Sequence, residues 1–272
     1  MVLQGVAEPL QPMQTFSRIR VLPWQSHDRW IVQGGPSWPD WDNQHAPRHL
    51  RNDLPVDTRP RDAAKASEMV DAPLLWGGAM PGHFGHFIAD YSTRILQSRA
   101  VHPMLKVGFI APRRTQPAKI APYLWEILDW LSLAKEDVLL VERPLRVGTL
   151  HVAAQAEQLG GDVAAGIGPS PAYLHLLEQN QKRQGLQPVE SDVVYVSRAG
   201  LAGTTKGHHA GEGYLVSLLQ GLGVQILTPE KVSLRQQLQI YAGARHLIFA
   251  EGSALHGRQL LVRVDQTVTV LL

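Results

Sequence analysis

The chain has 272 residues, of which 44% are hydrophobic and 18% are charged, and its formal net charge is +2. This composition is typical of a globular protein with one large or two small domains, and the charge is too small to indicate a nucleic-acid-binding surface. The absence of cysteine excludes disulfides, a thiolate nucleophile and cysteine-bound zinc. No window approaches 18 consecutive apolar residues, and the first 20 residues lack the basic start and apolar run of a secretory signal.

We expect the first 70 residues to be irregular. Their Pro- and Trp-rich stretch GGPSWPDWDNQHAPR (34–48) is more typical of an ordered loop than of a strand or helix. Trp38 and Trp41 in this stretch either pack the loop onto a core or offer a surface on which a sugar ring stacks, since an aromatic face does both. This region is also the only candidate for contact with a membrane surface.

From residue 73 onward, apolar runs of strand length alternate with runs at helical spacing. A buried strand that ends in glycines leads into the expected helix GHFGHFIADYSTRIL (82–96). The remaining expected elements of this half are strands at 72–80, 106–113, 137–142 and 146–154 and a helix at 117–133.

The segment LGGDVAAGIGPSPAY (159–173) is too rich in glycine and proline to sustain an element. We therefore place a boundary within it, between a domain at 1–165 and a domain at 166–272. Strict alternation after it predicts a parallel sheet covered by helices on both faces, and such sheets bind ligands at the carboxyl ends of their strands. The expected helices are 171–185, 211–223, 233–244 and 253–262, and the expected strands are 192–198, 224–229, 246–252 and 266–272.

His86 and Asp90 lie four residues apart in the expected helix 82–96, so the imidazole and the carboxylate share one helical face. The pair suits a site that moves a proton or grips a polar ligand. It also suits a buried hydrogen bond between two core elements. Gly82 and Gly85 would let the helix begin tightly at a strand end and would leave room for a bulky substrate.

Arg198 ends one of the parallel strands, where its guanidinium fork would clamp a phosphate or carboxylate, although an ordinary surface arginine fits the same pattern. The Gly-rich loop after it contains a small cationic cluster, Lys206, His208 and His209, and ends at Glu212. We expect no metal there, because adjacent histidines point in different directions and further ligands are missing. A loop of this composition over a cleft would become ordered when a ligand binds.

The turn after the strand 246–252 carries a second group of polar residues. Gly252 lets another group approach the backbone, and Ser253 is suited to cap the next helix, whose free amides would bind an anion. A plain capped helix entrance fits as well. His256 would reach the same ligand or pack, and Glu251 would contact a hydroxyl or orient a donor. Together with Arg198 these residues predict a diphosphate-binding edge, although the chain has neither GxGxxG nor GxxxxGK[ST].

The order of these motifs resembles glycosyltransferase family 61, in the short bacterial form often labelled capsular polysaccharide biosynthesis protein. The resemblance covers residues 74–99 and 192–261, with a weakly matching stretch between them. It rests on a His-x-x-x-Asp helix, a Ser-Arg strand end, a Pro-Glu followed by a Gln-rich helix, and a Gly-Ser/Ala-x-x turn. The segments that carry it are GHFGHFIADYSTRIL, VYVSR, a Gly-Glu pair and GVQILTPEKVSLRQQLQIYAGARHLIFAEGSALH.

The resemblance implies an α/β fold with two Rossmann-like halves of glycosyltransferase B type, parallel sheets flanked by helices, with the acceptor on the first half and the donor on the second. It implies a nucleotide-sugar donor, inversion at the sugar carbon, and neither a metal nor another cofactor. Many relatives carry His-Gly-Ala where this chain has Glu251-Gly252-Ser253, and they usually continue beyond QTVTVLL. The resemblance implies that Arg198 and the Gly252-Ser253 turn hold the donor phosphates, that Glu212 contacts donor hydroxyls, and that His86 and Asp90 face the acceptor. Further expected contacts are Lys206, Glu251 and His256 to the donor and His83 to the acceptor.

We expect an inverting displacement in which an acceptor hydroxyl attacks the donor's anomeric carbon. Either His86 is the base and Asp90 fixes its tautomer, or Asp90 is the base. Two alternatives stay open: a transferase of another activated group such as pyruvyl or sulfuryl, and a catalytically silent paralogue that binds a nucleotide-sugar or acts as a scaffold. The expected partners are a nucleotide-sugar and a glycan or lipid-linked glycan acceptor, without nucleic acid. The expected location is the cytoplasm, at the inner face of the membrane where the acceptor is lipid-linked.

Overall fold

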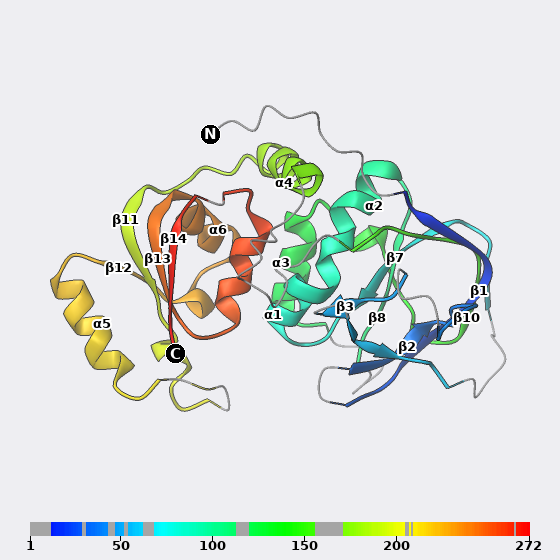
Figure 1. The fold of residues 1–272 in the computed structure, drawn as a ribbon, viewed down its shortest axis with the longest axis horizontal. Helices are drawn as coiled ribbons and strands as arrows, with labels where there is room; N and C mark the ends of the chain where they lie inside the picture. Colours follow the sequence, from blue (N-terminus) through cyan, green and yellow to red (C-terminus); the bar gives the residue numbers. More distant parts are fainter. Residues whose placement is uncertain are drawn as a thin grey trace. The chain divides into compact units, whose positions relative to one another are not determined.

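The computed structural model describes residues 12–28, 31–42, 47–51, 54–61, 68–112, 120–155, 171–204, 207, 209–263 and 265–272. The chain divides into two compact units, Met1–Asn180 and Gln181–Leu272 (Figure 1). This division falls within helix α4 (Pro171–Arg183). The expected boundary at residue 165 lies outside the described residues.

A mixed sheet forms the framework of the first unit. In the part of the chain that the structure describes, its strands follow the order β5 (Asp57–Thr58), β2 (Ile31–Pro36), β1 (Gln14–Asp28), β10 (Leu145–Val152), β7 (Leu74–Ala79), β8 (Val107–Ile110) and β9 (Val138–Leu140), with β6 (Glu68–Val70) beside β10. The strands from β10 to β9 run parallel, whereas β1 lies antiparallel to both β2 and β10. A separate ribbon pairs β3 (Leu50–Arg51) with β4 (Leu54–Pro55).

The expectation of an irregular N-terminal region is wrong for β1 and β2, which form a regular antiparallel pair. Arg18 adopts a left-handed backbone conformation with φ 51°. The alternation of buried and exposed positions along β1 therefore shifts by one residue at Arg18. This shift breaks the period-two pattern by which a strand is recognised in a sequence. Trp38 and Trp41 are buried, and the Trp38 ring lies 5.1 Å from that of Phe16, so both tryptophans pack into the core.

The expected helix 82–96 is present but is not a regular α-helix. It begins as α1 (Phe84–His86), continues as the π-helix η1 (Phe87–Tyr91) and the 3₁₀ turn η2 (Ser92–Arg94), and ends as α2 (Ile95–Val101). A π-helical turn contains one residue more than an α-helical turn and occurs most often at functional sites. The expected helix 117–133 is observed as α3 (Pro122–Trp130), which packs with α2 beside β7 and β8 (Figure 1).

The second unit contains the predicted parallel sheet. Its described strands follow the order β12 (Gln225–Leu227), β11 (Ser191–Val196), β13 (Ala244–Ala250) and β14 (Thr267–Leu271). The helices α4, α5 (Glu212–Gly221) and α6 (Leu234–Gly243) alternate with these strands, and Ser233 and Gln236 form a capping box at the start of α6. The expected helix 253–262 is instead the 3₁₀ helix η7 (Ser253–Leu260). The protein is therefore mixed α/β, with parallel strands flanked by helices.

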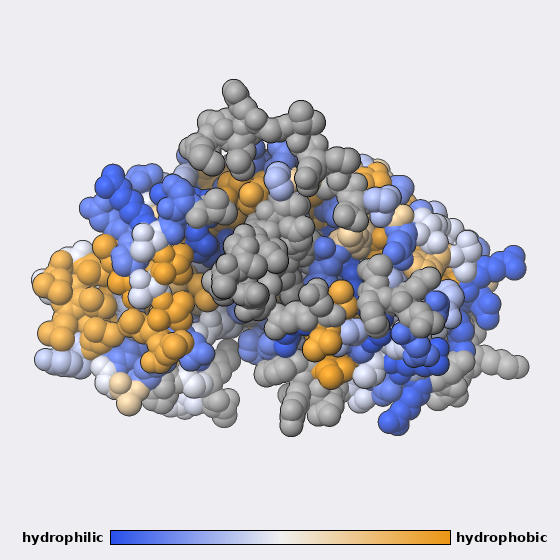
Figure 2. Space-filling view, in the orientation of Figure 1, coloured by the Kyte–Doolittle hydropathy of each residue, from blue (hydrophilic) through white to orange (hydrophobic). Residues whose placement is uncertain are grey.

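Helix α5 is mostly exposed, and Glu212 is the buried residue among its ten. Tyr214, Leu218 and Leu222 follow each other at intervals of four along and just beyond it, and all three are exposed. Figure 2 shows the resulting apolar surface over α5. Within the described ranges, no helix has the length and apolar character needed to cross a membrane.

Candidate functional site

His86 and Asp90 contact a third residue, Arg51, which the sequence pattern does not mark. Arg51 Nε donates a hydrogen bond to Asp90 Oδ1 at 3.1 Å, and Arg51 NH2 donates to Asp90 Oδ2. His86 Nδ1 lies 2.8 Å from Arg51 NH2 and 3.3 Å from Asp90 Oδ2. The sequence prediction that His86 and Asp90 share one helical face is confirmed, and we call these three residues the histidine cluster.

The histidine cluster combines a buried carboxylate with two partly exposed partners. Asp90 is 1% exposed, whereas the side chains of His86 and Arg51 are 22% and 28% exposed. Burial acts to raise the pKa of Asp90, but the hydrogen bonds from His86 and Arg51 outweigh it, so the pKa lies below 3.8. Asp90 is therefore an ionised hydrogen-bond acceptor at neutral pH, and His86 is the member of the original pair that reaches the surface.

The helix that carries Asp90 also anchors the segment that carries Arg51. Arg94 is fully buried in η2, and its guanidinium donates to the carbonyl oxygens of Pro47, at 2.7 Å, and of Arg48. Burial lowers the pKa of Arg94 to about 9. Asp90 therefore binds the side chain of Arg51, and Arg94 binds the backbone of the same segment (47–51). Together these contacts hold Arg51 beside the imidazole of His86.

His49, in the same segment, is a second residue that the sequence pattern does not mark. It is buried, its ring lies 4.8 Å from that of Tyr91, and burial lowers its pKa, so it is neutral. A Cβ atom on Gly78 would come within 2.4 Å of the His49 ring, and Gly78 has φ +102°. Glycine at the end of β7 is therefore required for the segment to pack here.

His83 lies beside His86 at the start of α1. The two rings have centroids 4.3 Å apart, and His83 Nδ1 accepts a hydrogen bond of 3.4 Å from the backbone N–H of His86. His83 is therefore the N-cap of α1 and adds a second imidazole next to the histidine cluster. A Cβ atom on Gly82 would meet nothing within 4 Å, so the position next to His83 is open.

In the second unit, Arg198 and Gly252 meet at the carboxyl edge of the sheet. They follow the neighbouring parallel strands β11 and β13, which confirms the prediction that they share this edge. A Cβ atom on Gly252 would lie 1.6 Å from Arg198 NH1, so only glycine leaves room for the guanidinium. Arg198 Nε and NH2 both donate to the carbonyl oxygen of Gly207, with the Nε contact at 3.0 Å. The side chain is therefore held between two loops.

Glu212 is bound by groups of the chain itself. Its Oε1 atom accepts hydrogen bonds from Tyr195 Oη at 3.0 Å, from Ser197 Oγ at 2.9 Å and from the backbone N–H of Arg198 at 2.7 Å. The residue is 4% exposed, and Oε2 is buried without a hydrogen-bond partner among the described residues. Glu212 therefore ties the start of α5 to the end of β11, and Oε2 alone is left for a further donor.

The turn after β13 differs from the expectation in one respect. Gly252, in an extended conformation, is the N-cap of η7, and no side-chain hydrogen bond caps this helix. The prediction that Ser253 caps the helix is therefore wrong, because Ser253 is already its first residue. Glu251 is exposed and His256 is half-buried.

Two predicted residues, Lys206 and His208, lie outside the described residues. His209 is described, and its carbonyl oxygen accepts a hydrogen bond of 3.3 Å from the backbone N–H of Glu212. Within the part of the chain that the structure describes, no group of three or more His, Cys, Asp or Glu side chains could hold a metal ion.

A family model, Glycosyltransferase 61, matches residues 84–258 of the chain. The matched segment begins at α1 and contains His86, Asp90, Arg198 and Gly252. No curated protein matches the chain. Arg51 precedes the matched segment by more than 30 residues, so neither the motif nor the spacing marks it. The one sequence signal that bears on it is the charge of Asp90, since a buried carboxylate requires a cationic partner.

Proposed function

Because the chain belongs to glycosyltransferase family 61, we propose that it transfers a sugar from a nucleotide-sugar donor to a hydroxyl group of a growing surface polysaccharide or other glycan. The histidine cluster is the observation that supports this most, because it places a partly exposed imidazole against an ionised carboxylate within the matched segment. Such a pair suits proton removal from a hydroxyl group.

We assign the donor to the second unit. Arg198 lies at the carboxyl edge of a parallel sheet, where ligands of such sheets bind, and its guanidinium rests on Gly252. A guanidinium stabilises the negative charge that accumulates on a departing diphosphate, and this kind of electrostatic stabilisation is often the largest catalytic contribution. In this proposal the two units are the halves of a glycosyltransferase of B type. The donor needs no metal, because Arg198 and the backbone amides supply the positive charge that a metal ion would otherwise supply.

We assign the proton transfer to His86. When Nδ1 carries the proton and donates to Asp90, Nε2 has a lone pair that accepts the proton of the acceptor hydroxyl. The hydroxyl oxygen then bonds to the anomeric carbon as the bond from that carbon to the diphosphate breaks, with inversion. Asp90 stabilises the imidazolium that results. Asp90 itself is a poorer base, because it is buried and both its oxygens accept from Arg51.

Arg51 competes with Asp90 for the same nitrogen of His86. Arg51 NH2 donates to an Nδ1 atom without a proton, whereas Asp90 accepts from an Nδ1 atom that carries one. The two contacts, at 2.8 Å and 3.3 Å, therefore belong to opposite tautomers of the imidazole. In the proposed mechanism, the tautomer that donates to Asp90 is the active one, and Arg51 acts as a positioning residue for Asp90.

A thermal-shift screen against UDP, GDP, CDP, CMP and ADP, with and without EDTA, tests the donor assignment. One nucleotide should raise the melting temperature in EDTA, because a ligand at a hundredfold excess over its Kd stabilises the native state by about 2.7 kcal/mol. The shift should vanish in Arg198→Ala. It should persist in Arg245→Ala, since Arg245 is an exposed arginine at the start of β13, paired with Asp192 at the opposite edge of the sheet.

The absence of a shift with every nucleotide would contradict the donor assignment. Hydrolysis of the nucleotide-sugar without acceptor separates an enzyme from a silent binding protein. We expect slow hydrolysis in the unaltered protein, and a protein that binds the nucleotide but never turns over would be a silent paralogue.

A further inference from the structure

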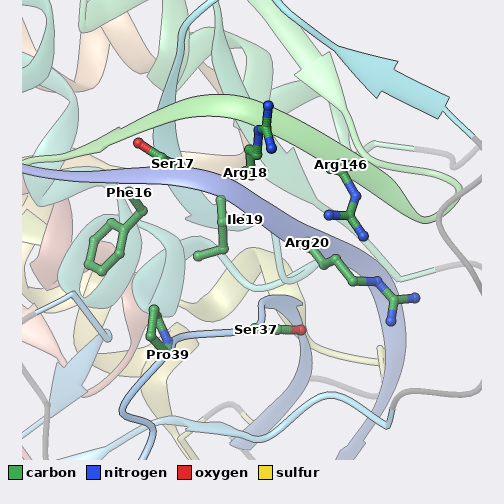
Figure 3. Close-up of a pocket in the computed structure, with 8 residues that line it drawn as sticks. All are labelled: Phe16, Ser17, Arg18, Ile19, Arg20, Ser37, Pro39 and Arg146. Carbon is green, nitrogen blue, oxygen red and sulfur yellow. The ribbon is translucent and has the colours of Figure 1, made fainter.

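A pocket of about 290 Å³ opens on the first unit, along β1 and β10 (Figure 3). It shares no residue with the histidine cluster or with the Arg198 edge. Its volume lies at the lower end of small-molecule sites, which suits one ring of a ligand rather than a nucleotide. The proposed transfer reaction makes no use of this pocket, so its lining needs a separate explanation.

The lining of the pocket is strongly basic. Arg18, Arg20 and Arg146 contribute to it, and the described residues that line the pocket include no Asp or Glu. Arg20 and Arg146 are directly paired across the antiparallel strands β1 and β10. Figure 3 shows their side chains at the same end of the pocket. An anion between two guanidinium groups in directly opposed positions would accept charge-assisted hydrogen bonds from both.

The backbone of the pocket wall is strained at Arg18. This residue has φ 51°, a conformation that is unfavourable for residues with a side chain, and such residues concentrate at ligand sites. The register places Arg18 between the pairs Ser17–Thr149 and Ile19–Val147, so the residue opposite it is Gly148. The left-handed conformation at Arg18 shifts by one residue the alternation of side chains between the two faces of β1. Residues on either side of Arg18 consequently contribute to the same pocket.

The opposite end of the pocket is apolar with hydroxyl groups nearby. Phe16 and Pro39 lie at this end in Figure 3, and the Phe16 ring is fixed by its contact with Trp38, 5.1 Å between centroids. Ser37 lies between the two ends, and its backbone N–H donates to the carbonyl oxygen of Arg20 at 2.8 Å. An aromatic ring and a proline suit the C–H face of a sugar, and serine hydroxyls suit its hydroxyl groups.

We propose that this pocket binds a single sugar residue that carries an anionic group, either a uronate carboxylate or a phosphate ester. Arg20 and Arg146 hold the anion with charge-assisted hydrogen bonds, and Phe16 and Pro39 pack against the ring. The inference goes beyond the proposed function, because it concerns the retention of an acidic glycan at a place distinct from the residues assigned to transfer. It holds whether or not the protein transfers a sugar.

Titrations of the full chain with glucuronate, glucose 6-phosphate, glucose and inorganic phosphate, followed by ligand-observed NMR, test the proposal. At least one acidic sugar should bind ten or more times more tightly than both glucose and inorganic phosphate, since charge-assisted hydrogen bonds and ring contacts then act together. The better of the two acidic sugars identifies the anionic group. Acidic sugars that bind no more tightly than glucose, or than inorganic phosphate, would overturn the proposal.

Substitutions locate the binding. Arg146→Gln and Arg20→Gln should each weaken binding of the acidic sugar at least tenfold and leave the weak binding of glucose unchanged. Arg143→Gln is the matched control, since Arg143 is exposed, pairs with Glu68 and does not line the pocket. Arg146 is exposed, so its substitution tests the site even where Arg20→Gln impairs folding. Equal loss of affinity in Arg143→Gln would overturn the assignment to this pocket.

Discussion

The two polar clusters of the molecule use their charges in different ways. In the histidine cluster, the ion pair between Arg51 and Asp90 fixes a carboxylate and leaves His86 partly exposed. At the edge of the second unit, Glu212 accepts three hydrogen bonds from the chain itself and is buried, while Arg198 stays half-exposed on Gly252. Each cluster therefore pairs one buried carboxylate with accessible nitrogen groups, His86 and Arg51 in the first and Arg198 in the second.

The comparison shows that charge alone does not identify the residues that meet a ligand. Asp90 and Glu212 are both acidic residues, yet both accept hydrogen bonds from donors of the protein itself. A buried carboxylate that accepts hydrogen bonds from the protein orients the groups that donate them. We therefore expect substitutions of the accessible groups to alter activity most, and substitutions of the buried acceptors to alter stability or orientation.

The largest effect should come from His86→Ala. Loss of a general base lowers the rate by about 10²- to 10⁴-fold, and Asp90→Asn should approach the same loss because it replaces the negatively charged acceptor of Nδ1–H with a neutral amide, half of which donates. Initial rates of sugar transfer, or of donor hydrolysis, measure it. The melting temperature of each variant serves as the control for folding. Near-full turnover in both variants with an intact fold would reduce the histidine cluster to a structural feature.

Glu212→Ala should act on stability instead. The substitution removes the acceptor of Tyr195, Ser197 and the Arg198 backbone N–H, and a buried donor without an acceptor costs about 1–3 kcal/mol. Urea unfolding at constant pH measures the change in the free energy of unfolding. Asp192→Ala is the control, because Asp192 is an exposed acidic residue on β11, the strand that also carries Tyr195. This substitution should change the free energy of unfolding by less than about 1 kcal/mol. An equally stable Glu212→Ala variant would contradict the structural role.

Gly252→Ala should weaken nucleotide binding by about tenfold, the equivalent of one charge-assisted hydrogen bond. The added Cβ atom would lie 1.6 Å from Arg198 NH1 and would push the guanidinium away from its position. The Kd of the nucleotide found in the thermal-shift screen is the readout. Gly213→Ala is the matched control, because a Cβ atom there meets nothing within 4 Å. Equal affinities in the two variants would separate Gly252 from the donor site.

The smallest effect concerns pH. The pKa of Asp90 is lowered in the folded state, so its contribution to stability is fully present above its ordinary value of 3.8 and is lost as the pH falls through the lowered value. The difference in unfolding free energy between the unaltered protein and Asp90→Asn should therefore shrink from about pH 5 to about pH 2. Denaturant titrations across this range measure it, and a constant difference would mean that Asp90 is not ionised in the folded protein.

The second unit could be predicted from the sequence almost completely, because each element there has the periodicity of its type. Strand 192–198 and helix 233–244 carry clean apolar patterns and are present as β11 and α6. The strand β1 could not be predicted, because the left-handed residue Arg18 changes the phase of its pattern. Local spacing carries no information about backbone strain of this kind.

The candidate site could be predicted only where its residues are close in sequence or follow adjacent strands. His86 and Asp90 satisfy the first condition, and Arg198 and Gly252 satisfy the second. Arg51 satisfies neither, because it lies on a two-residue strand and reaches Asp90 through a tertiary contact that Arg94 maintains. Such long-range contacts depend on packing that a single sequence does not display.

The π-helical turn at Phe87–Tyr91 has a consequence for insertions and deletions. A π-turn accommodates one residue more than an α-turn, and each residue of an α-helix rotates the chain by about 100°. Deletion of Ala89 would restore ordinary α-helical winding. The helical residues before position 89 would then be rotated about the helix axis relative to the residues after it. His86 and Asp90 would then be three residues apart and still neighbours on one face, but their relative orientation would change, although every side chain of the histidine cluster would still be present. In a comparison of this chain with an α-helical relative, the carboxylate equivalent to Asp90 should therefore appear beside a gap of one residue.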